Sequence, residues 1–109
     1  MTVKELSERL QTKMVLCPDL DREVEGVYTG DLLSWVMGNA SSGQALVTIM
    51  SNINVVAVAS LLDLSVVILS EGVTPDQDMM DAAKAKSVNL LVCEGTSYDV
   101  CVAISRILL

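Results

Sequence analysis

The chain has 109 residues, of which 51% are hydrophobic and 3% aromatic, and its formal net charge is −7. A chain of this length is expected to form one domain, which would span residues 1–109. The excess of Asp and Glu disfavours nucleic acid and anionic membranes as partners, because both carry negative charge. No apolar run reaches the roughly 18 residues of a membrane span, and residues 1–10 carry charges where an export signal is apolar. A cytoplasmic location is predicted.

The cysteine and histidine content argues against most enzymes. Cys17, Cys93 and Cys101 form no CxxC pair, and the chain has no histidine, the commonest general base and metal ligand. Cys93 with Glu94 offers a thiol beside a carboxylate, but the apolar run around Cys93 favours a structural role. In the cytoplasm the three thiols are expected to be reduced and mostly buried. We predict no catalytic residue, no metal and no cofactor.

The first part of the chain predicts one helix and two short strands. Thr2 and Glu5 have the spacing of a capping box, which begins a helix of about three turns. Residues 13–17 predict a strand that a turn at residues 18–21 ends. Alternating side chains over residues 24–29 predict a second, half-exposed strand.

A short helix and a loop are expected next. Asp31 can cap a helix that ends at Met37, because a carboxylate accepts from the free N–H groups of a first helical turn. The small residues from Gly38 to Gly43 predict a loop.

From Gln44 onward the chain repeats a strand, a short polar turn and a helix three times. The predicted strands are residues 45–50, 66–69 and 90–93, and the turns are Ser51–Asn54, Ser70–Gly72 and Glu94–Ser97. Strands joined by helices are expected to be parallel, with right-handed crossovers. The sequence therefore predicts an α/β fold with a single-domain, open, mostly parallel sheet and helices on both faces.

The last two helices have recognisable start signals. Pro75 is expected at the first helical position, with Asp76 and Asp78 in the positively polarised first turn. Thr96 and Asp99 have the spacing of another capping box, which begins the final helix.

The polar turns after the strands form a candidate ligand site. Ligands of open parallel sheets bind beyond the C-terminal ends of the strands, where hydroxyl, amide and helix N–H groups suit an anion or a small polar molecule. The same residue types also cap helices, which is the simpler interpretation of each turn taken alone. The candidate residues are Ser51, Asn52, Asn54, Ser70, Gly72, Thr96 and Ser97.

The helix predicted over residues 55–62 is apolar on every side through Val55–Ala59. A surface helix of a monomer shows a polar stripe, so this helix is either enclosed in the fold or buried against another subunit, and we favour the subunit contact. Trp35 is a second candidate interface anchor, with the core as an equal alternative. The candidate interface residues are Trp35, Val55, Val56, Val58 and Leu62.

Several segments between Asp21 and Leu108 carry a resemblance to a known family. Val27–Met37 resembles the passage from strand to helix in the DRTGG domain family, and Ala45–Ala59 resembles the apolar strand and helix of its free-standing small members. Pro75-Asp76 and Thr96–Tyr98 also fit that family.

Members of this family form the regulatory region of some phosphotransacetylases and CBS-domain pyrophosphatases, and are similar to the N-terminal domain of HPr kinase/phosphorylase. The family's Asp-Arg pair falls near Ser51-Asn52 and its Thr-Gly-Gly near Ser70–Gly72, where only Gly72 is retained. The resemblance implies a regulatory, often dimeric module without catalytic activity of its own.

Together these observations favour a non-catalytic regulatory or interaction module that forms a homodimer. The alternative is a sensor that binds an anionic metabolite or nucleotide at the candidate turn residues, and an enzyme is the least favoured hypothesis. The expected partner is therefore a second copy, another protein or a small anionic ligand, and not nucleic acid or membrane.

Overall fold

The computed structural model describes residues 1–108, except for the side chains of Met14 and Val15. Within this range the chain forms one five-stranded sheet and five helices. The strands are β1 (Met14–Leu16), β2 (Gly26–Thr29), β3 (Gln44–Thr48), β4 (Val66–Leu69) and β5 (Leu90–Val92). The helices are α1 (Val3–Leu10), α2 (Leu33–Asn39), α3 (Ile53–Leu62), α4 (Gln77–Lys86) and α5 (Ser97–Leu108). No helix in the described part is long and apolar enough to cross a membrane.

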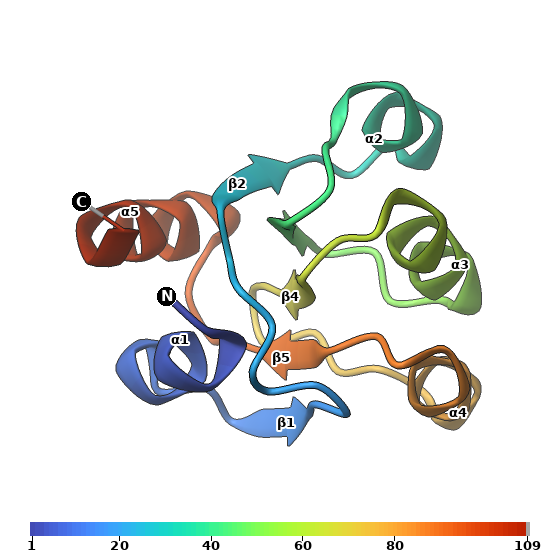
Figure 1. Cartoon of the computed structure of the whole chain (residues 1–109), viewed down its shortest axis with the longest axis horizontal. Helices are drawn as coiled ribbons and strands as arrows, with labels where there is room; N and C mark the ends of the chain where they lie inside the picture. Colours follow the sequence, from blue (N-terminus) through green and yellow to red (C-terminus); the bar gives the residue numbers. More distant parts are fainter. Residues whose placement is uncertain (109) are drawn as a thin grey trace.

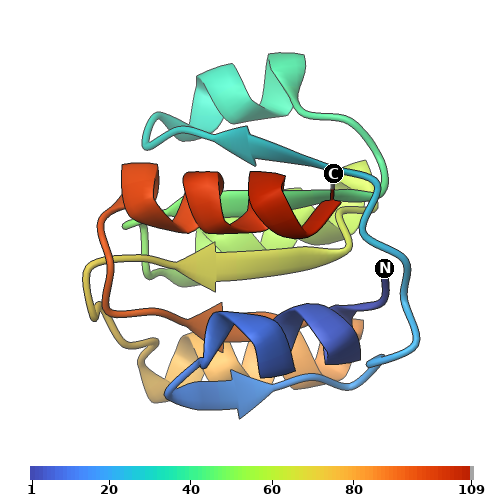
Figure 2. The same ribbon diagram turned by 90° about the vertical axis from the view of Figure 1, so that its left-hand side faces the viewer.

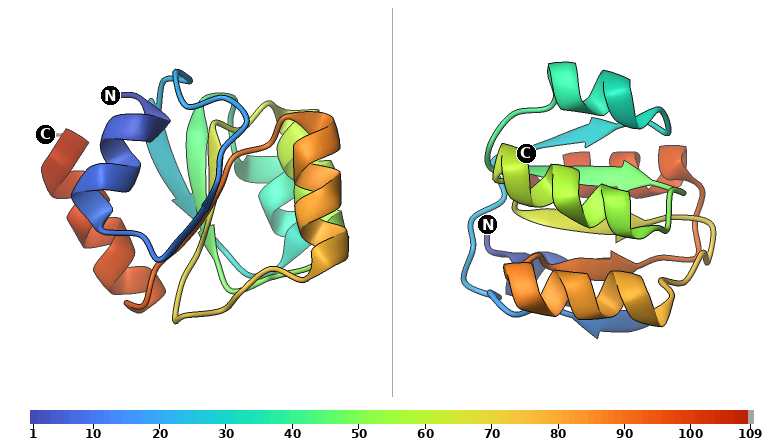
Figure 3. Two further views of the ribbon diagram at one scale, coloured as in Figure 1. Left: turned by 90° about the horizontal axis from the view of Figure 1, so that it is seen from below. Right: turned by 90° about the vertical axis from the view of Figure 1, so that its right-hand side faces the viewer.

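The sheet has the strand order β1-β5-β4-β3-β2. Strands β2 to β5 are parallel, and β1 is antiparallel to β5. Successive parallel strands advance in one direction, so crossovers of one hand place α2, α3 and α4 on the same face (Figures 1 and 3). Helices α1 and α5 cover the other face. The predicted α/β fold with helices on both faces is confirmed.

Strands β3, β4 and β5 are buried on both sides, as expected for a parallel sheet between two helical layers, whereas the residues of β2 are half-buried or exposed. One apolar cluster joins the sheet to α2, α3 and α4, and a second joins it to α1 and α5. The strand residues of the first cluster are Leu46, Val67, Leu69, Leu90 and Val92. Those of the second are Ala45, Val47, Val66, Ile68 and Leu91.

The start of α2 differs from the prediction. Asp31 does not cap this helix, because Leu32 is extended (φ −116°, ψ 106°) and occupies the N-cap position without a side-chain hydrogen bond. The Asp31 carboxylate instead accepts from the Thr48 hydroxyl (2.8 Å) and the Ile49 N–H (3.0 Å), joining the ends of β2 and β3. The helix also continues to Asn39, two residues into the predicted loop.

The start of α4 differs from the prediction by two residues. Asp76 is the N-cap, and its carboxylate accepts from the Met79 N–H at 2.8 Å. Pro75 therefore precedes the helix, and its ring is buried. An N-cap carboxylate satisfies a free N–H of the first turn, which a proline at the first position does not.

The helix α3 begins at Ile53, two residues before its predicted start, whereas the predicted starts of α1 and α5 are confirmed. The Thr2 hydroxyl accepts from the Glu5 N–H at 3.2 Å, and the Thr96 hydroxyl accepts from the Asp99 N–H at 3.1 Å. The carboxylates of Glu5 and Asp99 accept in return from the N–H groups of Thr2 and Thr96. Both capping boxes are thus complete.

One buried amide holds the β1–β2 connection against the sheet. Asn89 is 2% exposed, and its side-chain NH₂ donates to the carbonyl groups of Asp19 (2.8 Å) and Ser65 (2.9 Å). Its side-chain oxygen accepts from the Asp19 N–H at 3.0 Å. The Asn89 side chain therefore links the backbone of Asp19 to that of Ser65.

We predict that Asn89→Ala lowers the free energy of unfolding by about 2–4 kcal/mol, because it removes three hydrogen bonds and leaves the carbonyl group of the buried Ser65 without this donor. Urea denaturation followed by circular dichroism measures this loss. Asn39→Ala is the matched control, since Asn39 is exposed and makes one bond to the Trp35 carbonyl. Equal losses in the two variants would contradict the role of Asn89.

Candidate functional site

The turns after the parallel strands meet at one edge of the sheet, at the left in Figure 2. The hydroxyl oxygens of Ser70 and Ser97 lie 2.7 Å apart, which joins the turn after β4 to the start of α5. The Gly72 N–H donates to the Cys93 carbonyl at 2.8 Å. Gly72 has φ +70°, and a Cβ at this position would lie 3.1 Å from the Glu94 carboxylate. The turns after β4 and β5 therefore form one interlocked unit.

The predicted residues after β3 lie at the same edge but make only local bonds. Asn52 is the N-cap of α3, and its side-chain oxygen accepts from the Asn54 N–H at 2.9 Å. Ser51 is half-buried and Asn54 is exposed. The structure thus gives capping roles to Asn52 and Thr96, and a ligand role for the seven candidate residues stays a prediction.

The charge at this edge is negative. The turns after β2, β3, β4 and β5 contain no Lys or Arg. Lys13, which precedes β1, approaches this edge and forms an ion pair with Glu94 (2.7 Å). The partial positive charge of the helix N-termini stabilises carboxylate side chains at this edge. These carboxylates would repel an anionic ligand. The carboxylates at this edge are Asp31, Glu71, Asp76, Asp78, Glu94 and Asp99.

The three thiols are not poised for nucleophilic chemistry. Burial raises the pKa of Cys17 to about 11, although a weak hydrogen bond to the Leu90 carbonyl (3.7 Å) acts in the opposite direction. Burial also raises the pKa of Cys93 and Cys101. Within residues 1–108 no three Cys, Asp or Glu side chains lie close enough to hold a metal ion. These observations support a structural role for the cysteines.

We predict slow alkylation of the thiols in the folded protein. At about pH 8 a pKa of about 11 leaves Cys17 with a thiolate fraction about a hundredfold smaller than that of an unperturbed thiol. Peptide mass spectrometry after timed iodoacetamide treatment gives the rate for each cysteine, with the urea-unfolded chain as the reference. A Cys93 that reacts as fast in the folded as in the unfolded chain would contradict its structural role.

The predicted interface residues of α3 lie inside the fold. The side chains of Val55, Val56 and Val58 are buried in the cluster that joins the sheet to its helices, and Leu62 packs half-buried against it. The enclosed alternative therefore applies to the three valines. Their inward orientation follows from the position of α3 between α2 and α4 on the sheet (Figure 3).

The outer side of α3 is largely apolar, with Asn54 and Ser60 as its exposed polar residues. Ile53, Ala57 and Leu61 are exposed, with Ile53 at 51% and Leu61 at 68%. At the neighbouring α2, the N-cap residue Leu32 is 63% exposed and Trp35 within the helix is 64% exposed. We refer to these five apolar residues as the α2–α3 surface. Ile53, Ala57 and Leu61 have helical spacing in a stretch without charged residues, but the inner side of α3 is apolar too, so this spacing alone does not identify the outer side.

This charge-free stretch runs from Leu32 to Leu62, through α2, β3 and α3. The adjacent α4 differs, since its outer side carries Asp78, Asp81, Lys84 and Lys86, all of them exposed. One helical layer therefore combines an apolar and a charged surface.

A small polar cleft of about 240 Å³ lies at the opposite edge of the sheet. In it the Arg22 guanidinium lies 3.0 Å from the Asp63 carboxylate and donates to the Asp63 carbonyl at 2.7 Å. The bonds from Arg22 and from the Ser42 hydroxyl lower the pKa of Asp63. This cluster secures the left-handed C-cap of α3 and so has a structural role.

A scan against protein-family models found no match, and a search among curated proteins found none. Among solved structures, the chain is similar to the CBS and DRTGG domains of the regulatory region of a Clostridium perfringens pyrophosphatase, complexed with the activator diadenosine tetraphosphate. The TM-score is 0.69 and the sequence identity 14%, over 98% of this chain and 45% of that chain.

The fold is DRTGG-like. The identity of 14% supports a likeness of fold alone, so family membership by sequence stays a prediction. The chain also spans less than half of the chain that it matches. What the pyrophosphatase region binds is therefore a property of that protein.

Proposed function

We propose that this chain is a non-catalytic regulatory module that forms a homodimer through the α2–α3 surface. The observation that carries the proposal is the exposure of Trp35 and Leu61 on a part of the chain without a single charged residue. Interface cores are depleted of charge and enriched in aromatic side chains, and a large exposed apolar patch on a soluble protein marks an interaction site.

The charge distribution favours a second copy as the partner. Two chains with a net charge of −7 repel each other wherever their acidic surfaces meet. A two-fold contact places the same patch on both sides, and the α2–α3 surface brings no like charges together there. The likeness to a pyrophosphatase regulatory region supports the regulatory part of the proposal by analogy of fold.

A small-molecule sensor is the second candidate. It is favoured by the similar regulatory region, which is complexed with a nucleotide activator. It is disfavoured by the carboxylates at the edge of the sheet where the candidate turn residues lie. The backbone N–H groups at the helix N-termini are the groups at this edge that could still bind an anion.

We predict that the protein sediments as a dimer at about 100 μM and that Trp35→Asp and Leu61→Asp convert it to a monomer. A charge placed in an apolar contact loses its hydration without gaining a partner. Sedimentation velocity measures the mass, and circular dichroism confirms that the variants remain folded, since both positions are exposed in the single chain.

The control is Leu20→Asp, which introduces the same charge at a partly exposed leucine of the β1–β2 connection. This variant should remain a dimer. A monomeric parent protein, or a folded Leu61→Asp variant that is still dimeric, would refute the proposed interface.

A different experiment separates the module from the sensor. Asn52→Ala and Thr96→Ala should each cost about 1 kcal/mol through the lost helix cap. If the chain is not an anion sensor, diadenosine tetraphosphate or ATP leaves the Tm of the parent protein and of both variants unchanged. A nucleotide-induced rise in Tm that disappears in these variants would favour the sensor.

A further inference from the structure

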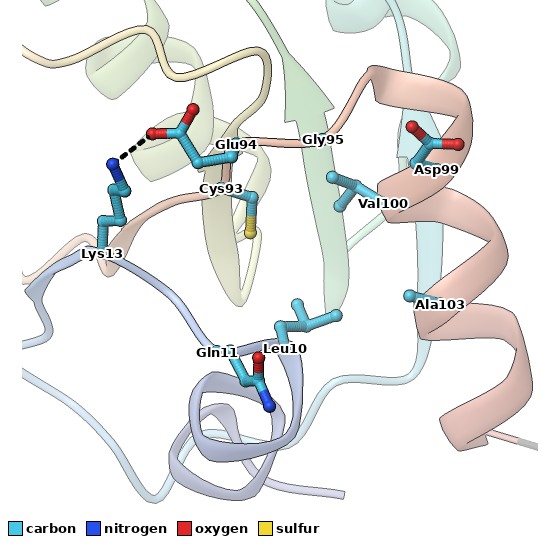
Figure 4. A pocket seen from close by; sticks show the side chains of 9 residues that line it. All are labelled: Leu10, Gln11, Lys13, Cys93, Glu94, Gly95, Asp99, Val100 and Ala103. Carbon is cyan, nitrogen blue, oxygen red and sulfur yellow. Dashed lines mark ion pairs between the residues drawn. The ribbon is translucent and has the colours of Figure 1, made fainter.

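A cleft of about 370 Å³ lies between the end of α1, the end of β5 and the start of α5 (Figure 4). This volume is within the range of about 300–1,000 Å³ that small-molecule sites occupy. The cleft is separate from the α2–α3 surface, because α1 and α5 cover the other face of the sheet. Its lining residues are Leu10, Gln11, Lys13, Cys93, Glu94, Gly95, Asp99, Val100 and Ala103.

The inner wall of the cleft is apolar and contains one buried thiol. Leu10 of α1 faces Val100 and Ala103 of α5 across the cleft, and the Cys93 sulfur points into the space between them (Figure 4). Cys93 is 6% exposed, and none of the described residues forms a hydrogen bond with its thiol. This wall suits a short aliphatic group, which would contact the thiol and three apolar side chains.

The rim of the cleft is polar and carries both signs of charge. Lys13 and Glu94 form their ion pair on one side, and the Asp99 carboxylate lies on the other (Figure 4). The Asp99 carboxylate accepts from the Thr96 N–H at 3.3 Å, which fixes its position beside Gly95. The rim therefore offers one cation and two carboxylates to a ligand.

The two helix ends at the cleft have opposite polarity. The C-terminal end of α1, at Leu10 and Gln11, presents carbonyl groups with partial negative charge. The first turn of α5, which lines the cleft with Asp99 and Val100, carries partial positive charge. Together with the charged rim, this arrangement suits a ligand that carries both an anionic and a cationic group.

We propose that this cleft binds a free α-amino acid with an aliphatic side chain. Lys13 and the start of α5 would bind the α-carboxylate. Glu94, Asp99 and the carbonyl groups at the end of α1 would bind the α-ammonium group. The side chain of the amino acid would lie against Leu10, Val100 and Ala103, over the Cys93 sulfur.

L-leucine is the probe, and methyl ¹H–¹³C NMR of the full chain is the measurement. Saturable shifts of the Leu10, Val100 and Ala103 methyl signals are expected, with a Kd in the range of about 1 mM or below. The absence of saturable shifts up to about 10 mM leucine would overturn the proposal.

Two analogues test the charged groups. Isoamylamine lacks the carboxylate of leucine, and 4-methylpentanoate lacks its ammonium group. Each should bind at least about tenfold more weakly, as expected for a lost charge-assisted hydrogen bond. An analogue that binds as tightly as leucine would overturn the assignment of a zwitterionic ligand.

Two variants test the site, each with a matched control. Lys13→Ala should weaken leucine about tenfold without weakening isoamylamine, because it removes the partner of the carboxylate and releases Glu94 for the ammonium group. Lys4→Ala, on the exposed side of α1, should change the binding of neither ligand. Ala103→Met should fill the cleft and abolish the leucine-induced shifts at Leu10 and Val100. Ala85→Met, on the exposed side of α4, should leave them intact. Equal effects of a variant and its control would overturn the placement. Neither result depends on the dimer.

Discussion

The central constraint of this structure is that four parallel strands must be covered on both faces. The residues of β3, β4 and β5 are buried on both sides, so neither face of the sheet can remain in water. Three consecutive crossovers supply α2, α3 and α4, but all to the same face. The remaining face is left to α1 and α5, which lie outside the repeating strand–helix units. The crossover connections therefore determine one helical layer, α2 to α4. The other layer is formed by the first and the last helix of the chain, α1 and α5.

Structural features that depend on neighbouring residues, such as strand bounds and helix caps, could be predicted from the sequence. Strand β4 coincides with the predicted residues 66–69, because polar residues border its apolar run on both sides. The capping boxes were found because both partners lie within four residues. The role of Asp31 could not be found in this way, since its partner Thr48 is brought near only by the pairing of β2 with β3.

The candidate sites could likewise be predicted only in part. The C-terminal edge of the sheet follows from the strand order, and the structure brings Ser70, Gly72 and Ser97 together there. The side of α3 that faces outward could not be deduced, because the stretch Val55–Ala59 is apolar on every side and gives no periodicity that separates Val55 from Ile53. The cleft beside Cys93 was also missed. One wall of it comes from the end of α1, at Leu10 and Gln11, and the position of this helix depends on packing against α5 and not on a local motif.

The packing of α1 against α5 and the pairing of β1 with β5 have a consequence for the order of folding. Strands β2 to β5 each pair with a neighbour about twenty residues away, whereas β1 pairs with β5 across most of the chain. Contacts with such a large sequence separation cost more loop-closure entropy and are expected to form late in folding. The N-terminal segment is thus the natural unit of partial opening in the native state. A ligand held between α1 and α5 would oppose that opening, so hydrogen exchange in β1 would report its binding.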